Sequence, residues 1–284
     1  MRFSHVSLGA LALAVATPAF ADPKPAGPVD PVAAAPAGEA PAPAAAADET
    51  APPPEITVTG GVTLVSDYRF RGISQTNLQP AIQGTLSVTH KSGFYATVWS
   101  SSTSGYVTFS GTGSQEIDAI VGYSKTVGGF KLDGGLLYYI YPRSRPVGDN
   151  SKGDFFEPYA DVSYTLGPVT AKVTVNYAWK QKALSLDQGQ TGLLPKNDNV
   201  YLAGDLSAAI PKTPLSLSAH IGHTWGPSWL ALGNEYTDWG VGASLAWKNL
   251  TLGVSYVDTD GVFTLANGKN AARSGVVVSL GASF

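Results

Sequence analysis

The sequence contains no cysteine, few charged residues and no long apolar run. The absence of cysteine excludes disulfides and thiolate metal sites. Charged residues make up 14% of the 284 residues, whereas a typical soluble domain has about 25%, and this shortage favours a surface that faces lipid. A net charge of -3 gives no electrostatic case for binding nucleic acid. No stretch beyond the amino terminus reaches the roughly 20 apolar residues of a transmembrane helix, so any membrane residence must use strands.

The amino-terminal residues have the composition of an export signal. Arg2 provides a basic start, Leu8 to Ala16 form a short apolar stretch, and Ala19-Phe20-Ala21 has the small-x-small pattern of a cleavage site. The apolar stretch is too short to cross a bilayer as a helix. We therefore expect residues 1–21 to be a signal peptide that is cleaved on export.

Residues 22–54 consist mostly of proline and alanine and contain almost no aromatic or branched apolar side chains. Such a segment cannot bury enough apolar surface to offset the entropy lost on ordering. We expect a disordered tether with polyproline-II character, which would extend on the order of 100 Å at about 3.1 Å per residue. That length would allow contact with the cell wall, although a spacer without a partner is the simpler interpretation.

From Glu55 onward apolar and polar residues alternate, as in strands with one apolar and one polar face. In 169–180 one face carries Val, Ala, Val, Val, Tyr and Trp, and the other carries Thr, Lys, Thr, Asn, Ala and Lys. In 237–248 the apolar stripe is bounded by Trp239 and Trp247, a pattern typical of the aromatic girdles of membrane barrels.

About twelve such spans follow one another, each near the nine to eleven residues of a tilted membrane strand. They are 57–72, 80–90, 93–101, 115–125, 129–141, 154–166, 168–180, 198–209, 214–225, 236–247, 249–258 and 274–284. Their connections alternate between short and long, which is typical of bacterial barrels. We therefore expect an all-β fold, a transmembrane antiparallel β-barrel of about 12 strands over residues 55–284, with both ends of the chain in the periplasm.

A soluble β-sandwich would also show alternation and regular turns. It would bury its apolar face, however, and would need neither external aromatic residues nor long and short connections in alternation. The barrel also leaves no strand edge unpaired, as a bilayer requires. The sequence favours the barrel.

Charged residues on the polar faces are candidates for the lining of a pore. Within the first predicted strand, Asp67, Arg69 and Arg71 share one face, and Tyr68 and Phe70 share the other. If the aromatic residues face lipid, the charged residues face the lumen, because a charge in mid-bilayer costs about 2–4 kcal/mol. The other candidates are Glu116, Asp118, Lys131, Asp133, Glu157, Asp161, Lys172 and His220.

Two interpretations of Arg69 and Arg71 remain open. They could form a constriction that orients anionic solutes, since the guanidinium fork suits carboxylates and phosphates. They could instead pair inside the barrel with acids such as Glu116, Asp118, Asp133, Glu157 or Asp161. We favour the internal pairs, because the predicted lumen holds both signs of charge in comparable number. For the same reason no ion selectivity can be assigned.

Aromatic residues near the ends of the apolar faces are candidates for the membrane interface. They are Tyr177, Trp179, Trp225, Trp239, Trp247 and Phe284. Because Phe284 ends the last predicted strand, we expect that strand to be recognised by the barrel-assembly machinery.

Several short segments resemble the proteobacterial TorF-type porin family, an uncharacterised outer-membrane family. The most specific are Ser66–Thr76, Pro80–Gly84, Gly93–Ala96 and Val98–Ser101. Further matches are Glu116-Ile117-Asp118, Gly122-Tyr123, Tyr138–Pro142, Glu157-Pro158-Tyr159, Asp258-Thr259-Asp260 and the terminal Phe284. The resemblance covers the barrel from about residue 56 and implies an outer-membrane channel, but it names no substrate.

We therefore expect passive diffusion of small hydrophilic solutes through a lumen lined by polar side chains, with no cofactor.

A hydrolase would need a serine, a histidine and an orienting group within reach. Ser218 and His220 share a face, but no nucleophile elbow is present. A metal site at His220 and His223 is disfavoured because the two side chains lie on opposite faces of one strand. A non-conducting barrel that anchors loops 142–153 and 181–197 as structural or adhesive surfaces is the other alternative, and the oligomeric state cannot be read from the sequence.

Overall fold

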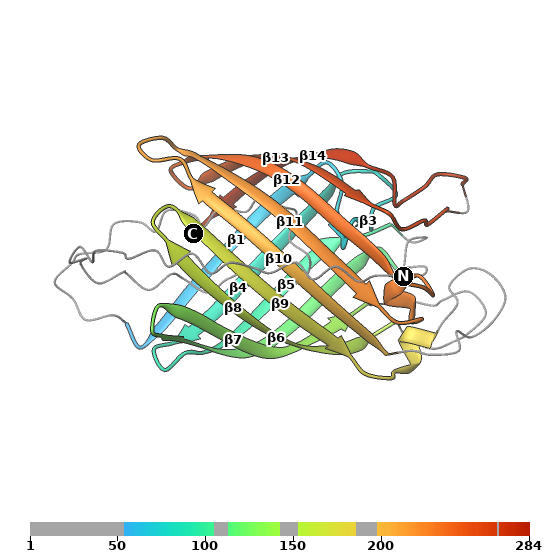
Figure 1. Cartoon of the computed structure of the whole chain (residues 1–284), viewed down its shortest axis with the longest axis horizontal. Coiled ribbons are helices and arrows are strands. Elements are labelled where there is room, and N and C mark those ends of the chain that lie inside the picture. Colours follow the sequence, from blue (N-terminus) through green and yellow to red (C-terminus); the bar gives the residue numbers. More distant parts are fainter. Residues whose placement is uncertain (1–53, 105–112, 143–152, 186–197, 266) are drawn as a thin grey trace, which may run out of the picture.

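The computed structural model describes residues 54–104, 113–142, 153–185, 198–265 and 267–284, which form one closed antiparallel barrel (Figure 1). Twelve strands make the wall. They are β1 (Ile56–Val65), β4 (Ala81–His90), β5 (Phe94–Ser102), β6 (Gln115–Val127), β7 (Phe130–Ile140), β8 (Phe155–Leu166), β9 (Val169–Ala178), β10 (Asn199–Ala209), β11 (Leu215–Trp225), β12 (Tyr236–Trp247), β13 (Leu250–Thr259) and β14 (Gly275–Ser283).

Each strand pairs with its neighbour in the chain, and β1 pairs with β14 to close the wall. At this seam the backbone amides of Gly60 and Phe284 each donate to the carbonyl of the other, at 3.0 and 2.9 Å. The predicted barrel of about 12 strands is confirmed, and no sheet edge is left in the wall.

The predicted spans from 80–90 to 274–284 coincide with strands of the wall within a few residues. The first span, 57–72, is wrong in its second half, because β1 ends at Val65 and the chain then turns into the barrel. There it forms a separate two-stranded sheet of β2 (Arg69–Phe70) and β3 (Ile73–Ser74). We call residues 66–78 the inner segment.

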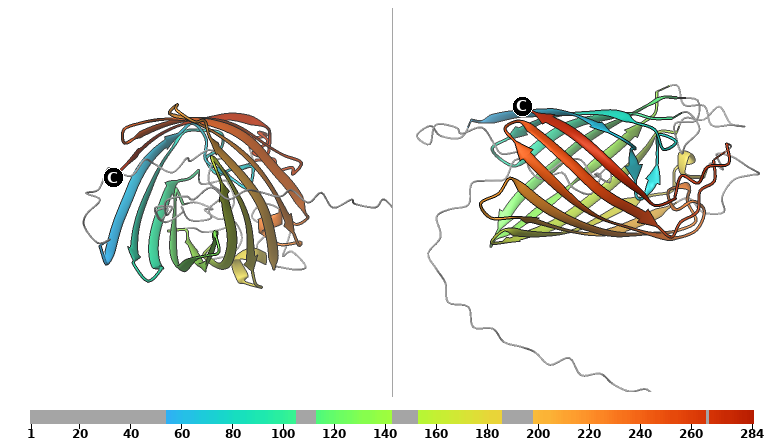
Figure 2. Two further views of the ribbon diagram at one scale, coloured as in Figure 1. Left: turned by 60° about the vertical axis from the view of Figure 1, so that its left-hand side comes forward. Right: turned by 90° about the horizontal axis from the view of Figure 1, so that it is seen from above.

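The two ends of the barrel differ. Tight turns such as Gly128-Gly129 and Gly167-Pro168 lie at the end that carries Phe284, which we call the short-turn end (Figures 1 and 2). The opposite, long-loop end carries the 3-10 helices η2 (Lys182–Ser185) and η3 (Trp229–Ala231). None of the helices in the described ranges is long and apolar enough to traverse a bilayer. The predicted signal peptide at 1–21 and nearly all of the predicted tether at 22–54 lie outside the described residues.

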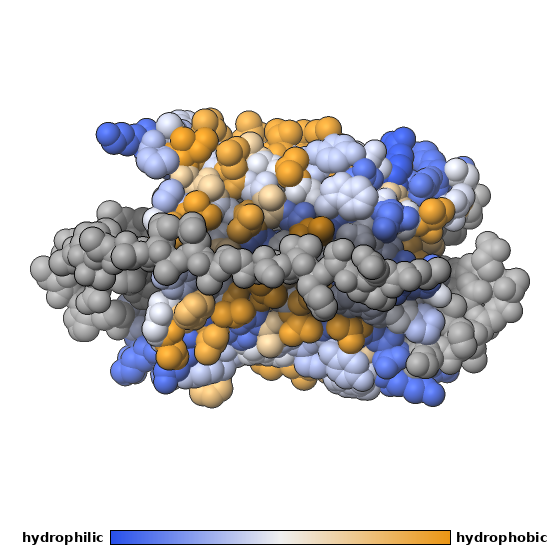
Figure 3. Space-filling view, in the orientation of Figure 1, coloured by the Kyte–Doolittle hydropathy of each residue, from blue (hydrophilic) through white to orange (hydrophobic). Residues whose placement is uncertain are grey.

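The outer face of the wall is apolar. Val58, Leu86, Val121, Ile221 and Val241 are among many exposed large apolar side chains on the strands. They form a band between more hydrophilic ends of the molecule (Figure 3). Alternate residues on the same strands turn inward, so that period-two alternation produces two chemically different faces of one sheet.

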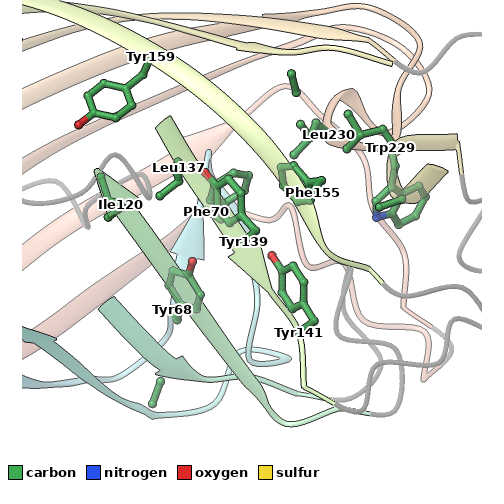
Figure 4. Close-up of a cluster of buried hydrophobic side chains, with 14 of the residues drawn as sticks. Tyr68, Phe70, Ile120, Leu137, Tyr139, Tyr141, Phe155, Tyr159, Trp229 and Leu230 are labelled. Atoms are coloured by element: carbon green, nitrogen blue, oxygen red, sulfur yellow. The ribbon is translucent and has the colours of Figure 1, made fainter. Parts of the chain in front are cut away.

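Inside the long-loop half, the lumen contains a packed core that includes Tyr68, Phe70, Tyr139, Phe155 and Trp229 (Figure 4). The rings of Tyr139 and Phe155 stack at 4.3 Å between centroids, and Phe70 meets Tyr139 edge-on at 6.0 Å. This core surrounds the inner segment. It positions the charged residues described next.

Candidate functional site in the barrel lumen

The inner segment is the most completely buried stretch of the chain, since every residue from Asp67 to Thr76 is buried. Its hairpin turns at Arg71 and Gly72, which have φ of 47° and 80°. Two consecutive positive φ values are those of a two-residue hairpin turn that favours glycine. A Cβ at Gly72 would lie 2.9 Å from Thr259 Cβ and 3.0 Å from Asp238 Cβ, so the turn fits closely against β12 and β13.

Asp67 organises the inner segment. Its carboxylate accepts hydrogen bonds from Arg69 Nε at 2.6 Å, Ser74 Oγ at 2.6 Å and Thr76 Oγ1 at 2.9 Å. Charge-assisted bonds of this kind are roughly twice as strong as neutral ones. The carboxylate therefore joins both arms of the hairpin.

Arg69 ties the hairpin to the connection between β13 and β14. Its Nη1 donates to the carbonyl oxygens of Gly72 at 2.9 Å, Ala271 at 3.3 Å and Arg273 at 2.8 Å. The ion pair of Arg69 with Asp67 neutralises its charge.

Arg71 ties the hairpin to the opposite wall. Its Nη2 donates to both carboxylate oxygens of Glu157 at 2.8 and 2.9 Å, and its Nη1 donates to Asn199 Oδ1 at 3.3 Å. The guanidinium also lies 4.1 Å from the ring centroid of Tyr201 and 4.8 Å from that of Phe70. Burial alone would lower the pKa of Arg71, but Glu157 outweighs it and raises the pKa above its ordinary value, so the group stays charged.

The placement of Tyr68 and Phe70 differs from the sequence prediction. The lumen placement of Arg69 and Arg71 was argued on the condition that both aromatic residues face lipid, but both are buried inside the barrel. Tyr68 packs against Trp99 at 5.3 Å between ring centroids and donates to Glu116 Oε1 at 3.1 Å. Because the inner segment is enclosed on all sides, alternation along it does not separate a lipid face from a lumen face.

Glu116 and Asp118 lie on the inward face of β6 beside this core, and both are buried. Neither carboxylate oxygen of Asp118 has a hydrogen-bond partner in the part of the chain that the structure describes. The arginines pair with Asp67 and Glu157 and not with these two acids.

A second group of charges lines the short-turn half of the lumen. Asp133 and Asp161 lie directly opposite each other on β7 and β8, and Tyr95 Oη donates to Asp133 at 2.6 Å and contacts Tyr159 Oη. Lys172 on β9 lies 3.7 Å from Asp205 on β10. Lys131 occupies the inward face of β7 near the tight turn.

His220 joins two acids that the sequence analysis did not select. Its Nδ1 lies 2.7 Å from Asp205 Oδ1, and its Nε2 lies 3.0 Å from Asp238 Oδ1. Both ring nitrogens therefore have carboxylate partners, whereas Ser218 Oγ has none among the described residues. The polar side of the alternation in 237–248 contains Asp238, so the signal for it was present in the sequence.

The predicted interface aromatics are all on the outside of the barrel. Tyr177, Trp179, Trp225 and Trp239 lie toward the long-loop end, and Trp247 and Phe284 lie toward the short-turn end. His223 is also outward and contacts the ring of Trp225 at 4.4 Å between centroids. Within the described ranges, no three His, Asp or Glu side chains converge as a metal site.

Comparison with solved structures finds the same architecture in bacterial porins. The structure of the NanC porin is 13% identical in sequence, with a TM-score of 0.50, and the match covers 80% of this chain and 99% of that one. The structure of the KdgM porin in complex with disordered oligogalacturonate is 9% identical, with a TM-score of 0.50, and the match covers 80% of this chain and 98% of that one. At these identities the likeness shows the fold. The comparison with curated proteins gave no match.

A family model described as "Bacterial protein of unknown function (Gcw_chp)" matches residues 47–284. This range contains the whole barrel, the inner segment and every charged residue of the candidate site. The chain belongs to the Gcw_chp family of bacterial proteins of unknown function.

Proposed function

We propose that the protein is an outer-membrane channel for passive diffusion of small hydrophilic solutes, narrowed on its long-loop side by the inner segment. The observation that carries this proposal is the division of one closed wall into an apolar outer face and a charged inner face. Such a wall is stable in a bilayer because all backbone groups are paired within it. Polar inward side chains lower the cost of moving a polar solute past lipid.

The proposal also assigns the export, the insertion and the membrane orientation of the chain. Residues 1–21 direct export, residues 22–54 form a periplasmic tether, and residues 55–284 are inserted with both ends of the barrel chain in the periplasm. The short turns at the end that carries Phe284 support this orientation. The resemblance to TorF-type porins agrees with it. We assign recognition by the assembly machinery to the β14 strand, no cofactor to the protein and no chemistry to its lumen.

A non-conducting barrel is a second candidate, and one observation favours it. The inner segment and the core around it occupy the long-loop half of the lumen, and residues 67–76 are all buried. A barrel of about twelve strands also lies between small filled barrels and wide aqueous porins. If the segment does not move, the barrel would act as an anchor for its loops.

Single-channel recording in a planar bilayer separates the two candidates. The purified mature chain is compared with an Arg69→Ala/Arg71→Ala variant, which loses the two arginine attachments of the inner segment. We expect discrete steps of low conductance in the wild type, with larger steps and a shifted reversal potential in the variant under a salt gradient. Lys91→Ala is the control, because Lys91 forms an exposed pair with Glu55 outside the lumen.

Folded wild-type and variant proteins that both give no steps would rule out the channel and leave the anchor. Steps that are identical in the wild type and the double variant would retain the channel but remove the inner segment from its path. The oligogalacturonate of the KdgM porin complex does not serve as a guide to the solute here, since inward acids such as Glu116 and Asp118 have no basic partner among the described residues.

A further inference from the structure

The buried acids Glu116 and Asp118 form no ion pair with a basic side chain among the described residues. The two residues are two positions apart on β6, so their side chains point to the same inward side of the wall. Asp118 is 0% exposed and Glu116 is 1% exposed. Within the described residues, both oxygens of Asp118 lack a hydrogen-bond donor.

The neighbours of the pair are aromatic and acidic. Across the sheet, Asp118 lies opposite Trp99 on β5 and Tyr139 on β7. Glu116 accepts a hydrogen bond from Tyr68 Oη at 3.1 Å. The guanidinium of Arg71 is engaged by both oxygens of Glu157, and that of Arg69 by Asp67.

An ionised carboxylate that is removed from water without a partner is strongly unfavourable. Two such groups side by side also repel each other. Hydrogen bonding does not stabilise the charge of Asp118, since none of the described residues donates a hydrogen bond to it. The pair must therefore be neutralised either by protons on the carboxyl groups or by a bound cation.

We propose that Glu116 and Asp118 bind a hard divalent cation, Ca²⁺ or Mg²⁺, inside the long-loop half of the barrel. Two carboxylates match the charge of such an ion, and they offer oxygen, the ligand type that these ions prefer. No third carboxylate or imidazole among the described residues converges on the pair, so the ion retains part of its water shell, as Mg²⁺ commonly does.

The site would link the wall to the inner segment, because Tyr68 of that segment already bonds to Glu116. The bound ion therefore favours the inserted position of the segment. This inference does not depend on conduction, and it would hold for a non-conducting barrel as well.

Terbium luminescence tests the site directly. Tb³⁺ takes the same oxygen ligands as Ca²⁺, and its emission is sensitised by tyrosine close to the ion. The full mature chain is refolded in detergent with a chelator, freed of the chelator, and titrated with Tb³⁺ under excitation of tyrosine. We expect saturable emission that Ca²⁺ displaces.

Asp118→Asn and Glu116→Gln keep the size of each side chain and remove its charge, and each should weaken Tb³⁺ affinity by about tenfold or more. Asp258→Asn is the matched control, because Asp258 accepts a hydrogen bond from Tyr256 on the outside of the barrel, and it should leave the emission unchanged. Circular dichroism confirms that each variant is folded.

Absence of sensitised emission in the folded wild type would overturn the proposal. Emission that persists at wild-type affinity in the Asp118→Asn protein would also overturn it, because the ion would then bind elsewhere. A barrel that gives no steps in a planar bilayer would contradict the proposed channel but would leave this result unaffected.

Discussion

Arg71 and Glu157 form a buried ion pair in which one guanidinium nitrogen donates to both carboxylate oxygens, at 2.8 and 2.9 Å. The two residues are 86 positions apart in the chain. The pair therefore joins the turn of the inner segment to the far wall of the barrel. Glu157 also accepts hydrogen bonds from Tyr139 at 3.0 Å and Asn176 at 3.3 Å, which keeps its carboxylate in place.

Removal of one partner of the Arg71–Glu157 pair should lower the free energy of unfolding far more than replacement of both partners. Arg71→Ala leaves the Glu157 charge buried without its counter-ion, and we expect the free energy of unfolding to fall by about 3–5 kcal/mol. An Arg71→Met/Glu157→Gln protein leaves no buried charge at the pair and should lose less. Urea unfolding in lipid vesicles measures both changes. Lys91→Ala, which breaks an exposed pair, should lose less than about 1 kcal/mol; equal losses in all three would contradict the assignment.

Gly72 should be intolerant of any side chain. Its φ of 80° disfavours other residues, and a Cβ would approach Thr259 and Asp238 within 3.0 Å. We expect Gly72→Ala to destabilise the protein by roughly 1–3 kcal/mol and to loosen the inner segment, which should increase single-channel conductance. Gly128→Ala is the control, because Gly128 has φ of 59° but a Cβ there would meet nothing within 4 Å. A conductance change shared by both variants would argue against a local effect at the turn.

His220 should be doubly protonated at neutral pH. Each ring nitrogen faces a carboxylate oxygen, at 2.7 and 3.0 Å, and an ionised carboxylate can only accept. Nitrogen NMR of isotopically labelled histidine should therefore show an imidazolium at this position. His223 provides the comparison within the same spectrum, because it faces outward and has a hydroxyl partner, Thr237 Oγ1, at 2.9 Å. A neutral ring at His220 would contradict the assignment of both ring nitrogens as donors to carboxylates.

An introduced charge should cost much more insertion free energy at one position of β11 than at the adjacent one. Leu217 is 50% exposed on the apolar face, whereas Ser218 points inward. Leu217→Arg should cost about 2–4 kcal/mol on insertion into lipid if it lies near the bilayer midplane, and Ser218→Arg should cost much less. Refolding yields into vesicles and into detergent micelles are compared for both variants. A similar loss in vesicles for both positions would contradict the lipid-facing assignment.

The barrel wall was predictable because local pattern and global fold agree along β9, β12 and the other strands. Alternation, tight turns such as Gly167-Pro168 and terminal aromatic residues all point to one structure. The inner segment was not predictable on the same grounds. Asp67 to Arg71 alternate as a strand would, but Arg71 finds its partners on β8 and β10, and these contacts between distant parts of the chain leave no local signal.

The same limit applies to the candidate site. Alternation grouped the acids and bases of the polar faces as candidates, but it could not say which of them pair. Asp205 and Asp238 were not selected as candidates, although their carboxylates lie within hydrogen-bond distance of the two ring nitrogens of His220. Glu116 and Asp118 were expected as partners for arginine, and only the three-dimensional arrangement shows that Arg69 and Arg71 are engaged by Asp67 and Glu157.

The seam between β1 and β14 also constrains the order of assembly. The first strand of the wall completes its pairing only when the last one, more than 200 positions later, is available. The inner segment follows β1 directly, yet its partners include Glu157, Asn199 and Ala271. Folding is therefore dominated by contacts of high sequence separation and should be slow. The inner segment can complete its contacts only after β8, β10 and the connection between β13 and β14 have been added, so its docking is coupled to the closure of the wall.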